Sequence, residues 1–202
     1  MRAAESIEQS YARTGHPETD QRVMLSGVDW ATYVSLRDRY ESPAVRMTYL
    51  KGTLELMSPS PLHESIKTRI NRLLSMWAIE RDVPLQGFGS TTFRREQVER
   101  GLEPDECYVL GAQLDEVPDL AIEVVVTSGG IDKLAVYAPL GVPEVWFWMD
   151  GSFQVRVLVA GRYEAREQSA LLPQLDLVQL ASFCHEPNQH EALKAYRAAL
   201  RG

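Results

Sequence analysis

The sequence predicts an α/β fold, in which strands and helices pack as layers around a core. Residues 103–149 predict two β-rich runs, a helix and a largely apolar strand, and this β-β-α-β order with a buried last strand is typical of such layers. Residues 62–82 have the clearest helical period in the chain, because Ile66, Ile70 and Trp77 fall on one face.

The composition indicates one folded unit. A chain of 202 residues that is 45% hydrophobic and 24% charged can form one substantial core but hardly two. We therefore expect a single domain over residues 25–202, preceded by a flexible tail over residues 1–24. The first 20 residues are polar and unlike a signal sequence, and no apolar run is long enough to span a bilayer.

The cysteine content points to the cytoplasm. Cys107 and Cys184 are the two cysteines, and their spacing is not that of metal ligands. Structural zinc and a disulfide framework are therefore poorly supported, and a reducing cytoplasm is the expected location.

The other elements follow from short periodic runs between turn residues. A helix is predicted first, and Lys51-Gly52 then joins two short strands as a hairpin. The last helix begins after Asn188, with Glu191 three residues later as in a capping box. The predicted elements outside residues 103–149 are a helix at 30–40, strands at 46–50 and 53–57, the helix at 62–82, short strands within 87–94, a hairpin at 153–159 and 162–166, and a helix at 191–200.

The segment from Glu103 to Glu123 is the most informative part of the chain, because it holds seven acidic residues and no Lys or Arg. If its two β-rich runs form a hairpin symmetric about Leu114, Asp105 and Glu123 face each other. Opposed side chains in an antiparallel pair have Cβ atoms about 4.5–5.5 Å apart, and like charges there repel. A hard divalent cation relieves this repulsion. The alternative is an acidic hairpin whose side chains are simply solvated.

Several motifs in order resemble the putative restriction endonuclease family, which is numerous in cyanobacteria and is often described only as a domain of unknown function. The resemblance covers residues 25–185. The motifs that carry it are Tyr49-Leu50-Lys51-Gly52-Thr53-Leu54-Glu55-Leu56-Met57-Ser58-Pro59, His63-Glu64, Gly89-Ser90-Thr91-Thr92-Phe93, Glu103-Pro104-Asp105-Glu106, Pro118-Asp119-Leu120-Ala121-Ile122-Glu123, Ile131-Asp132-Lys133, Tyr137, and Gly141-Val142-Pro143-Glu144-Val145-Trp146.

This resemblance implies the PD-(D/E)XK nuclease fold, a mixed central sheet flanked by helices, with Mg²⁺ or Mn²⁺ held by acids. Asp105 and Glu123 match the two acidic positions of the motif. The motif lysine would fall at position 125, where this chain has Val125 on the same strand face as Glu123. Lys133 on the following helix is the main candidate to replace it. The alternative for Lys133 is an ordinary exposed helix residue, and Lys51 and Arg94 are lesser candidates.

Further acids could belong to the same centre. Glu103 has the strand parity of Asp105 and is a candidate third metal ligand. The resemblance implies that Glu64 matches an acid that some superfamily members supply from their first core helix, and Glu64 is a candidate catalytic residue. His63, Lys67 and Asn71 form a polar stripe on that helix, which either looks into a site or is simply solvated.

The net charge of −7 disfavours indiscriminate binding to nucleic acid, but the charge is unevenly distributed. Residues 1–100 carry 14 Lys and Arg against 13 Asp and Glu, whereas residues 101–202 carry 7 against 15. A basic rim for DNA must therefore come from the first half. The foremost candidates for it are Lys51, Lys67, Arg94 and Arg95, and Arg46, Arg69 and Arg72 are further candidates.

The sequence thus favours a metal-dependent endonuclease that hydrolyses DNA phosphodiester bonds with metal-activated water. A catalytically inactive module that binds nucleic acid or a protein partner is the main alternative, favoured by Val125. A hydrolase of small phosphorylated substrates is disfavoured because no Walker-type loop is present. A homodimer would suit cleavage of both strands of a duplex. Trp146 and Trp148 either belong to the core or are covered by a second copy.

Overall fold

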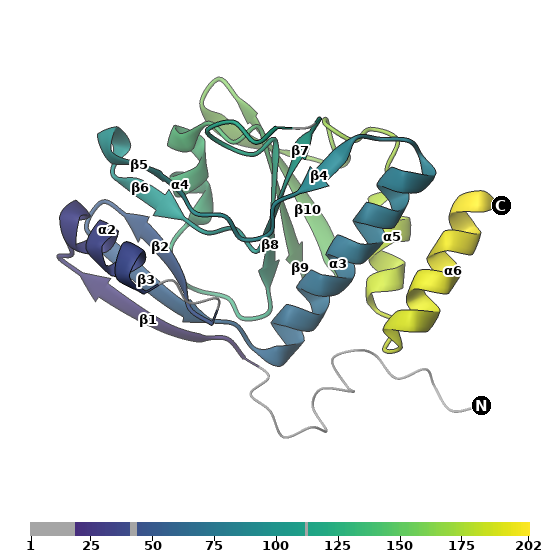
Figure 1. Ribbon diagram of the computed structural model, residues 1–202, viewed down its shortest axis with the longest axis horizontal. Helices are drawn as coiled ribbons and strands as arrows, with labels where there is room; N and C mark the ends of the chain where they lie inside the picture. The colour runs from purple at the N-terminus through teal and green to yellow at the C-terminus, as the bar shows by residue number, and fades with distance from the viewer. Residues whose placement is uncertain (1–18, 41–43, 112) are drawn as a thin grey trace.

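The computed structural model describes residues 19–40, 44–111 and 113–202, and they form two sheets with helices around them (Figure 1). The folded chain begins earlier than the predicted boundary of the tail at residue 24. Strand β1 spans Gln21–Ser26, whereas residues 1–18 of that tail lie outside the described residues. Strand β1 escapes prediction because its apolar residues, Val23, Met24 and Leu25, are consecutive and show no period-two alternation.

The first sheet is antiparallel, and helix α2 packs against it. Its strand order is β1-β3-β2-β6-β5. Tyr33 of the helix stacks on Tyr49 of β2 with ring centroids 4.9 Å apart, and Trp30 meets both rings. The elements are α2 (Trp30–Arg39), β2 (Arg46–Leu50), β3 (Thr53–Ser58), β5 (Phe93–Arg95) and β6 (Arg100–Leu102), with a 3-10 turn at Glu96–Val98.

The second sheet is mixed, as the resemblance implied. Its order is β11-β10-β9-β8-β7-β4, and only β8 and β9 are parallel. Helix α4 is the crossover between these two strands, as a parallel connection requires. The elements are β4 (Leu85–Gly87), β7 (Glu106–Leu110), β8 (Leu120–Val125), α4 (Lys133–Leu140), β9 (Glu144–Met149), β10 (Ser152–Val159) and β11 (Arg162–Arg166). The predicted β-β-α-β unit is therefore confirmed.

Three helices cover the face of this sheet that lies away from the first sheet (Figure 1). They are α3 (Pro61–Glu80), α5 (Leu177–Cys184) and α6 (Gln189–Arg201). Helix α3 starts where Ser60 accepts the N–H of His63, and Pro61 suits the first turn because its missing N–H has no helical partner there. The predicted cap of α6 is confirmed, since Asn188 accepts the N–H groups of His190 and Glu191.

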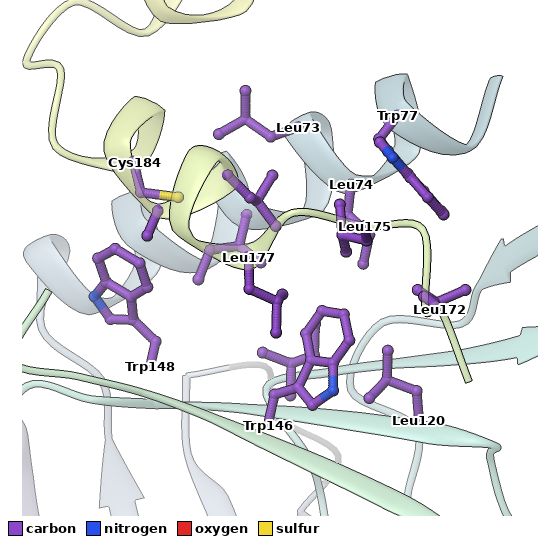
Figure 2. Packing of buried hydrophobic residues seen from close by; sticks show 14 of the residues in the cluster. Leu73, Leu74, Trp77, Leu120, Trp146, Trp148, Leu172, Leu175, Leu177 and Cys184 are labelled. Carbon is purple, nitrogen blue, oxygen red and sulfur yellow. The ribbon is translucent and has the colours of Figure 1, made fainter. Parts of the chain in front are cut away.

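The main core lies between these helices and the sheet. Trp146, Leu73 and Leu74 are fully buried there, and Trp148 is 3% exposed (Figure 2). The helices therefore cover both tryptophans of β9, and the suggestion that a second copy covers them is wrong. Within the described ranges, no helix is both long and apolar enough to cross a membrane.

Candidate functional site

Two buried acids meet where the β7–β8 hairpin ends. The register of the hairpin pairs Glu106 with Ile122, and its continuation by one residue sets Asp105 opposite Glu123, so the predicted symmetry about Leu114 holds. Each of the two acids is only 1% exposed. The backbone N–H of Val124 donates to Asp105 Oδ2 over 2.8 Å and fixes that carboxylate against β8.

Cations from elements far away in the sequence surround Asp105. His63 Nε2 lies 3.0 Å and Arg46 Nε 3.1 Å from Asp105 Oδ1. The other ring nitrogen of His63 lies 3.2 Å from Asp20 Oδ2, which comes from the residue before β1. Burial lowers the pKa of His63, but the carboxylates of Asp105 and Asp20 outweigh burial and raise it to about 9. Burial by itself raises the pKa of Asp105. The positive charges of His63, Lys133 and Arg46 have a larger, opposite effect, so the pKa of Asp105 lies well below its usual range.

Helix α4 supplies the partners of Glu123. The ammonium of Lys133 contacts Glu123 Oε2, and the hydroxyl of Tyr137 donates to Glu123 Oε1. Burial raises the pKa of Glu123 to about 7. The negative charge of Asp105 raises this pKa further, and the positive charge of Lys133 offsets the rise only in part. Burial lowers the pKa of Lys133, but Glu123 and Asp105 more than compensate and raise it. Lys133 is therefore a partly buried cation that contacts the centre and not an ordinary exposed helix residue.

Glu123 and Lys133 line a cavity of about 290 Å³ between the two sheets. Val125 lines the same cavity, so the position of the missing motif lysine does face the centre. Glu55 of β3 accepts the N–H of Ile131 over 3.0 Å and thereby holds the loop that leads into α4. Arg22 and Arg156 also line this cavity. They bring positive charge to the cavity that Glu123 lines, although the chain as a whole is acidic.

The other predicted acids have partners of their own. Glu103 accepts the N–H of Met47 over 3.1 Å and pairs with Arg37 over 2.8 Å, so both of its oxygens are engaged in the first sheet. Glu64 lies at the edge of the centre, where it pairs with Arg46 over 3.2 Å and with Lys67. In the part of the chain that the structure describes, no three His, Cys, Asp or Glu side chains converge to hold a metal by themselves.

The foremost basic candidates are not gathered around the acids. Arg94 pairs with Asp38 over 2.7 Å and Arg95 with Glu116 over 3.2 Å. Both arginines line a separate cavity of about 560 Å³, which neither Asp105 nor Glu123 lines. The two basic residues that remain lie apart: Lys51 is in the β2–β3 turn, at the end of β2 away from Arg46, and Lys67 is on α3 beside Glu64.

Sequence reasoning missed Asp20 and Tyr137, and it did not predict that Arg46 contacts Asp105. His63 lies on the predicted polar stripe and does face the centre. Tyr137 had a usable signal, because it follows Lys133 by four residues and therefore shares its helix face. No spacing in the sequence predicts that Arg46 and His63 reach Asp105 or that Asp20 reaches His63.

A mixed sheet flanked by helices, with two opposed acids where one of its hairpins ends, is the arrangement that the resemblance implied. The Uma2 family, described as putative restriction endonuclease, matches residues 30–185. The chain therefore belongs to the Uma2 family, and this membership supports a function of nuclease type. Among solved structures, the chain is similar to a putative nuclease belonging to DUF820 from Anabaena variabilis ATCC 29413, at 12% identity and a TM-score of 0.49, over 84% of this chain and 99% of that one. No curated protein matches.

Proposed function

We propose that the protein is a metal-dependent endonuclease that hydrolyses DNA phosphodiester bonds by metal-activated water. The observation that carries this proposal is the Asp105–Glu123 pair with the Lys133 ammonium placed on Glu123. An acid pair and a lysine are the parts that such a centre needs, and here the lysine comes from α4 in place of position 125.

The donor set suits a hard divalent cation. Mg²⁺ typically takes one or two carboxylates and completes its shell with water and phosphate oxygens, so three converging side chains are not required. Asp105 Oδ1 is buried and is held by ion pairs with His63 and Arg46 at 3.0 Å and 3.1 Å. A carboxylate oxygen that already faces positive charge is a suitable ligand for a divalent cation. Asp105 and Glu123 would hold Mg²⁺ or Mn²⁺.

The side chains have separate tasks in this mechanism. When bound, the cation supplies Lewis-acid polarisation of the phosphoryl group and lowers the pKa of water. The N–H of Val124 fixes Asp105, and the Tyr137 hydroxyl fixes Glu123, so both carboxylates are held in place before substrate arrives. The Lys133 ammonium orients the attacking water and stabilises the charge that develops on the phosphate. Arg22 and Arg156 are placed at the cavity to meet backbone phosphates.

An inactive nuclease-fold module that binds nucleic acid or a protein partner is the second candidate. Val125 favours it, because the motif position is apolar although it faces the cavity. Lys133 weighs against it, since a partly buried lysine that contacts the second acid restores the missing charge. Only turnover separates the two candidates, because an inactive centre can still bind cations.

The test is cleavage of single-stranded and supercoiled double-stranded DNA with Mg²⁺ or Mn²⁺. We expect metal-dependent nicking by the wild type and at least a 100-fold loss in Asp105→Ala and Glu123→Ala, a loss typical of removing a group that acts in the transition state. Glu116→Ala is the matched control, because Glu116 is an exposed acid of the same hairpin. Cleavage that survives both site changes would exclude this centre, and no cleavage by folded wild type would favour the inactive module.

A further inference from the structure

His63 is held as a metal-binding histidine typically is. The residue lies in the first turn of α3, and its side chain is fully buried. Asp20 lies 3.2 Å from His63 Nδ1, and Asp20 is itself fixed by the N–H of Ser60 over 2.9 Å. A carboxylate on one ring nitrogen sets the ring orientation and directs the other nitrogen, which is the usual support for a histidine ligand. Here that other nitrogen, Nε2, faces Asp105.

The contact between His63 and Asp105 is close. Nε2 and Oδ1 are 3.0 Å apart, and both atoms are buried. Two neighbouring ligands at about 2.1 Å from an octahedral cation are themselves about 3.0 Å apart. The separation of this ion pair is therefore also one that two adjacent ligands of one ion can have.

We propose that His63 Nε2 and Asp105 Oδ1 are adjacent ligands of the divalent cation. This inference rests on the proposed function and adds a nitrogen ligand to the carboxylates of the centre. Imidazole is a typical ligand of transition metals such as Zn²⁺, Fe²⁺ and Ni²⁺, whereas Mg²⁺ and Ca²⁺ prefer oxygen. Of the two ions proposed for this centre, a nitrogen ligand favours Mn²⁺, the transition metal, over Mg²⁺. Glu123 would reach the ion from the opposite strand.

Arg46 connects the centre to the surface. Its Nε lies 3.1 Å from Asp105 Oδ1 in a buried ion pair. Its other end pairs with Glu64, whose side chain is 40% exposed. A cation that binds Asp105 Oδ1 would have to displace Arg46 from it.

Pulsed electron paramagnetic resonance of Mn²⁺ bound to the metal-free full chain tests the inference directly. We expect a coordinated ¹⁴N signal in wild-type protein and its replacement by ¹⁵N coupling when the histidines carry ¹⁵N. This comparison needs no substitution, so it stands even if a variant does not fold. His63→Gln should remove the signal and weaken Mn²⁺ binding at least about tenfold, with a smaller effect on Mg²⁺. His185→Gln should change neither, because His185 packs against Trp148 and its Nε2–H donates to the Gly151 carbonyl oxygen elsewhere in the fold.

The outcomes separate this inference from the nuclease proposal. Bound Mn²⁺ without histidine nitrogen coupling would overturn the His63 ligand, even if the protein cleaves DNA. Coupling that persists in His63→Gln would overturn it as well, since another histidine would then be the ligand. Histidine coupling that His63→Gln removes supports the ligand even where no cleavage is found, and in that case only the nuclease proposal fails.

Discussion

At the scale of single residues, the centre keeps two buried negative charges by giving each a different cation. Asp105 has His63 and Arg46 beside it, whereas Glu123 has Lys133. Unpaired buried carboxylates cost several kcal/mol, so these contacts keep the metal-free protein folded with its ligands in place. Each contact is also one that a divalent cation or a phosphate can replace.

The charge on His63 predicts a pH dependence of stability in chelator-treated protein. Its pKa is about 9 in the fold and near 6.5 in the unfolded chain, so the folded state binds this proton more tightly. The stabilisation is complete below pH 6.5 and is lost as the pH rises through 9, with an upper limit of about 3 kcal/mol.

Urea unfolding of wild type and His63→Gln from pH 6 to 10 measures this effect. We expect the wild type to lose stability relative to the variant mainly between pH 7 and 9. Glu123 interferes little between pH 7 and 9. Its pKa is raised to about 7, so the stability that its proton contributes is lost mostly below pH 7. If the unfolding free energies of wild type and His63→Gln differ by the same amount at every pH from 6 to 10, His63 does not carry this charge in the folded protein.

At the scale of elements, the sequence predicted best what depends on neighbours in the chain. The β7–β8 register followed from symmetry about Leu114, and the helical period of residues 62–82 gave α3 within two residues at either end. The surroundings of Asp105 were not predictable, since Arg46 of β2 and His63 of α3 contact it and only the tertiary fold brings these elements together. The short strands after Pro84 were predicted as one region, but β4 and β5 belong to different sheets.

Helix α3 should carry much of the stability of the fold through its buried face. Leu74 is fully buried between the helix and the second sheet, whereas Ile79 on the same helix is 78% exposed. Leu74→Ala removes core contacts and leaves a cavity, which should cost about 2–5 kcal/mol. Ile79→Ala is the matched control and should change stability by less than about 0.5 kcal/mol. Urea midpoints measure both, and equal effects would show that this face of α3 is not the core.

At the scale of the whole molecule, the two sheets meet at the cavity that Glu123 and Lys133 line. Within the described residues, strand β1 at the edge of the first sheet pairs with β3 alone, and its Val23, Met24 and Leu25 are 55%, 47% and 38% exposed. Edge strands are usually protected by charges or proline, and Arg22 is the only charge here. The β1 strands of two chains could pair in antiparallel fashion about a twofold axis at Val23 or Met24. Arg22 of one chain would then face an uncharged residue of the other, so the pairing would bring no like charges directly together.

We therefore expect the homodimer suggested by the sequence to form through β1. Light scattering after size exclusion should give twice the chain mass of 22.8 kDa for the wild type. Met24→Lys places like charges near the twofold axis and should shift the protein to monomer, whereas Val178→Lys on exposed α5 should not. A wild type that is monomeric at all concentrations would contradict this assembly.

Lys133 of α4 is proposed to take the role of the motif lysine that position 125 lacks. Single-turnover DNA cleavage by Lys133 variants tests this most directly. Lys133→Met should lower the cleavage rate at least 100-fold while Mn²⁺ binding persists. Adding Val125→Lys to that variant should restore part of the rate, because position 125 faces the same cavity as Glu123. Lys51→Met should cleave as the wild type does, since Lys51 lies in the β2–β3 turn. Cleavage by Lys133→Met at the wild-type rate would contradict the claim that Lys133 replaces the motif lysine.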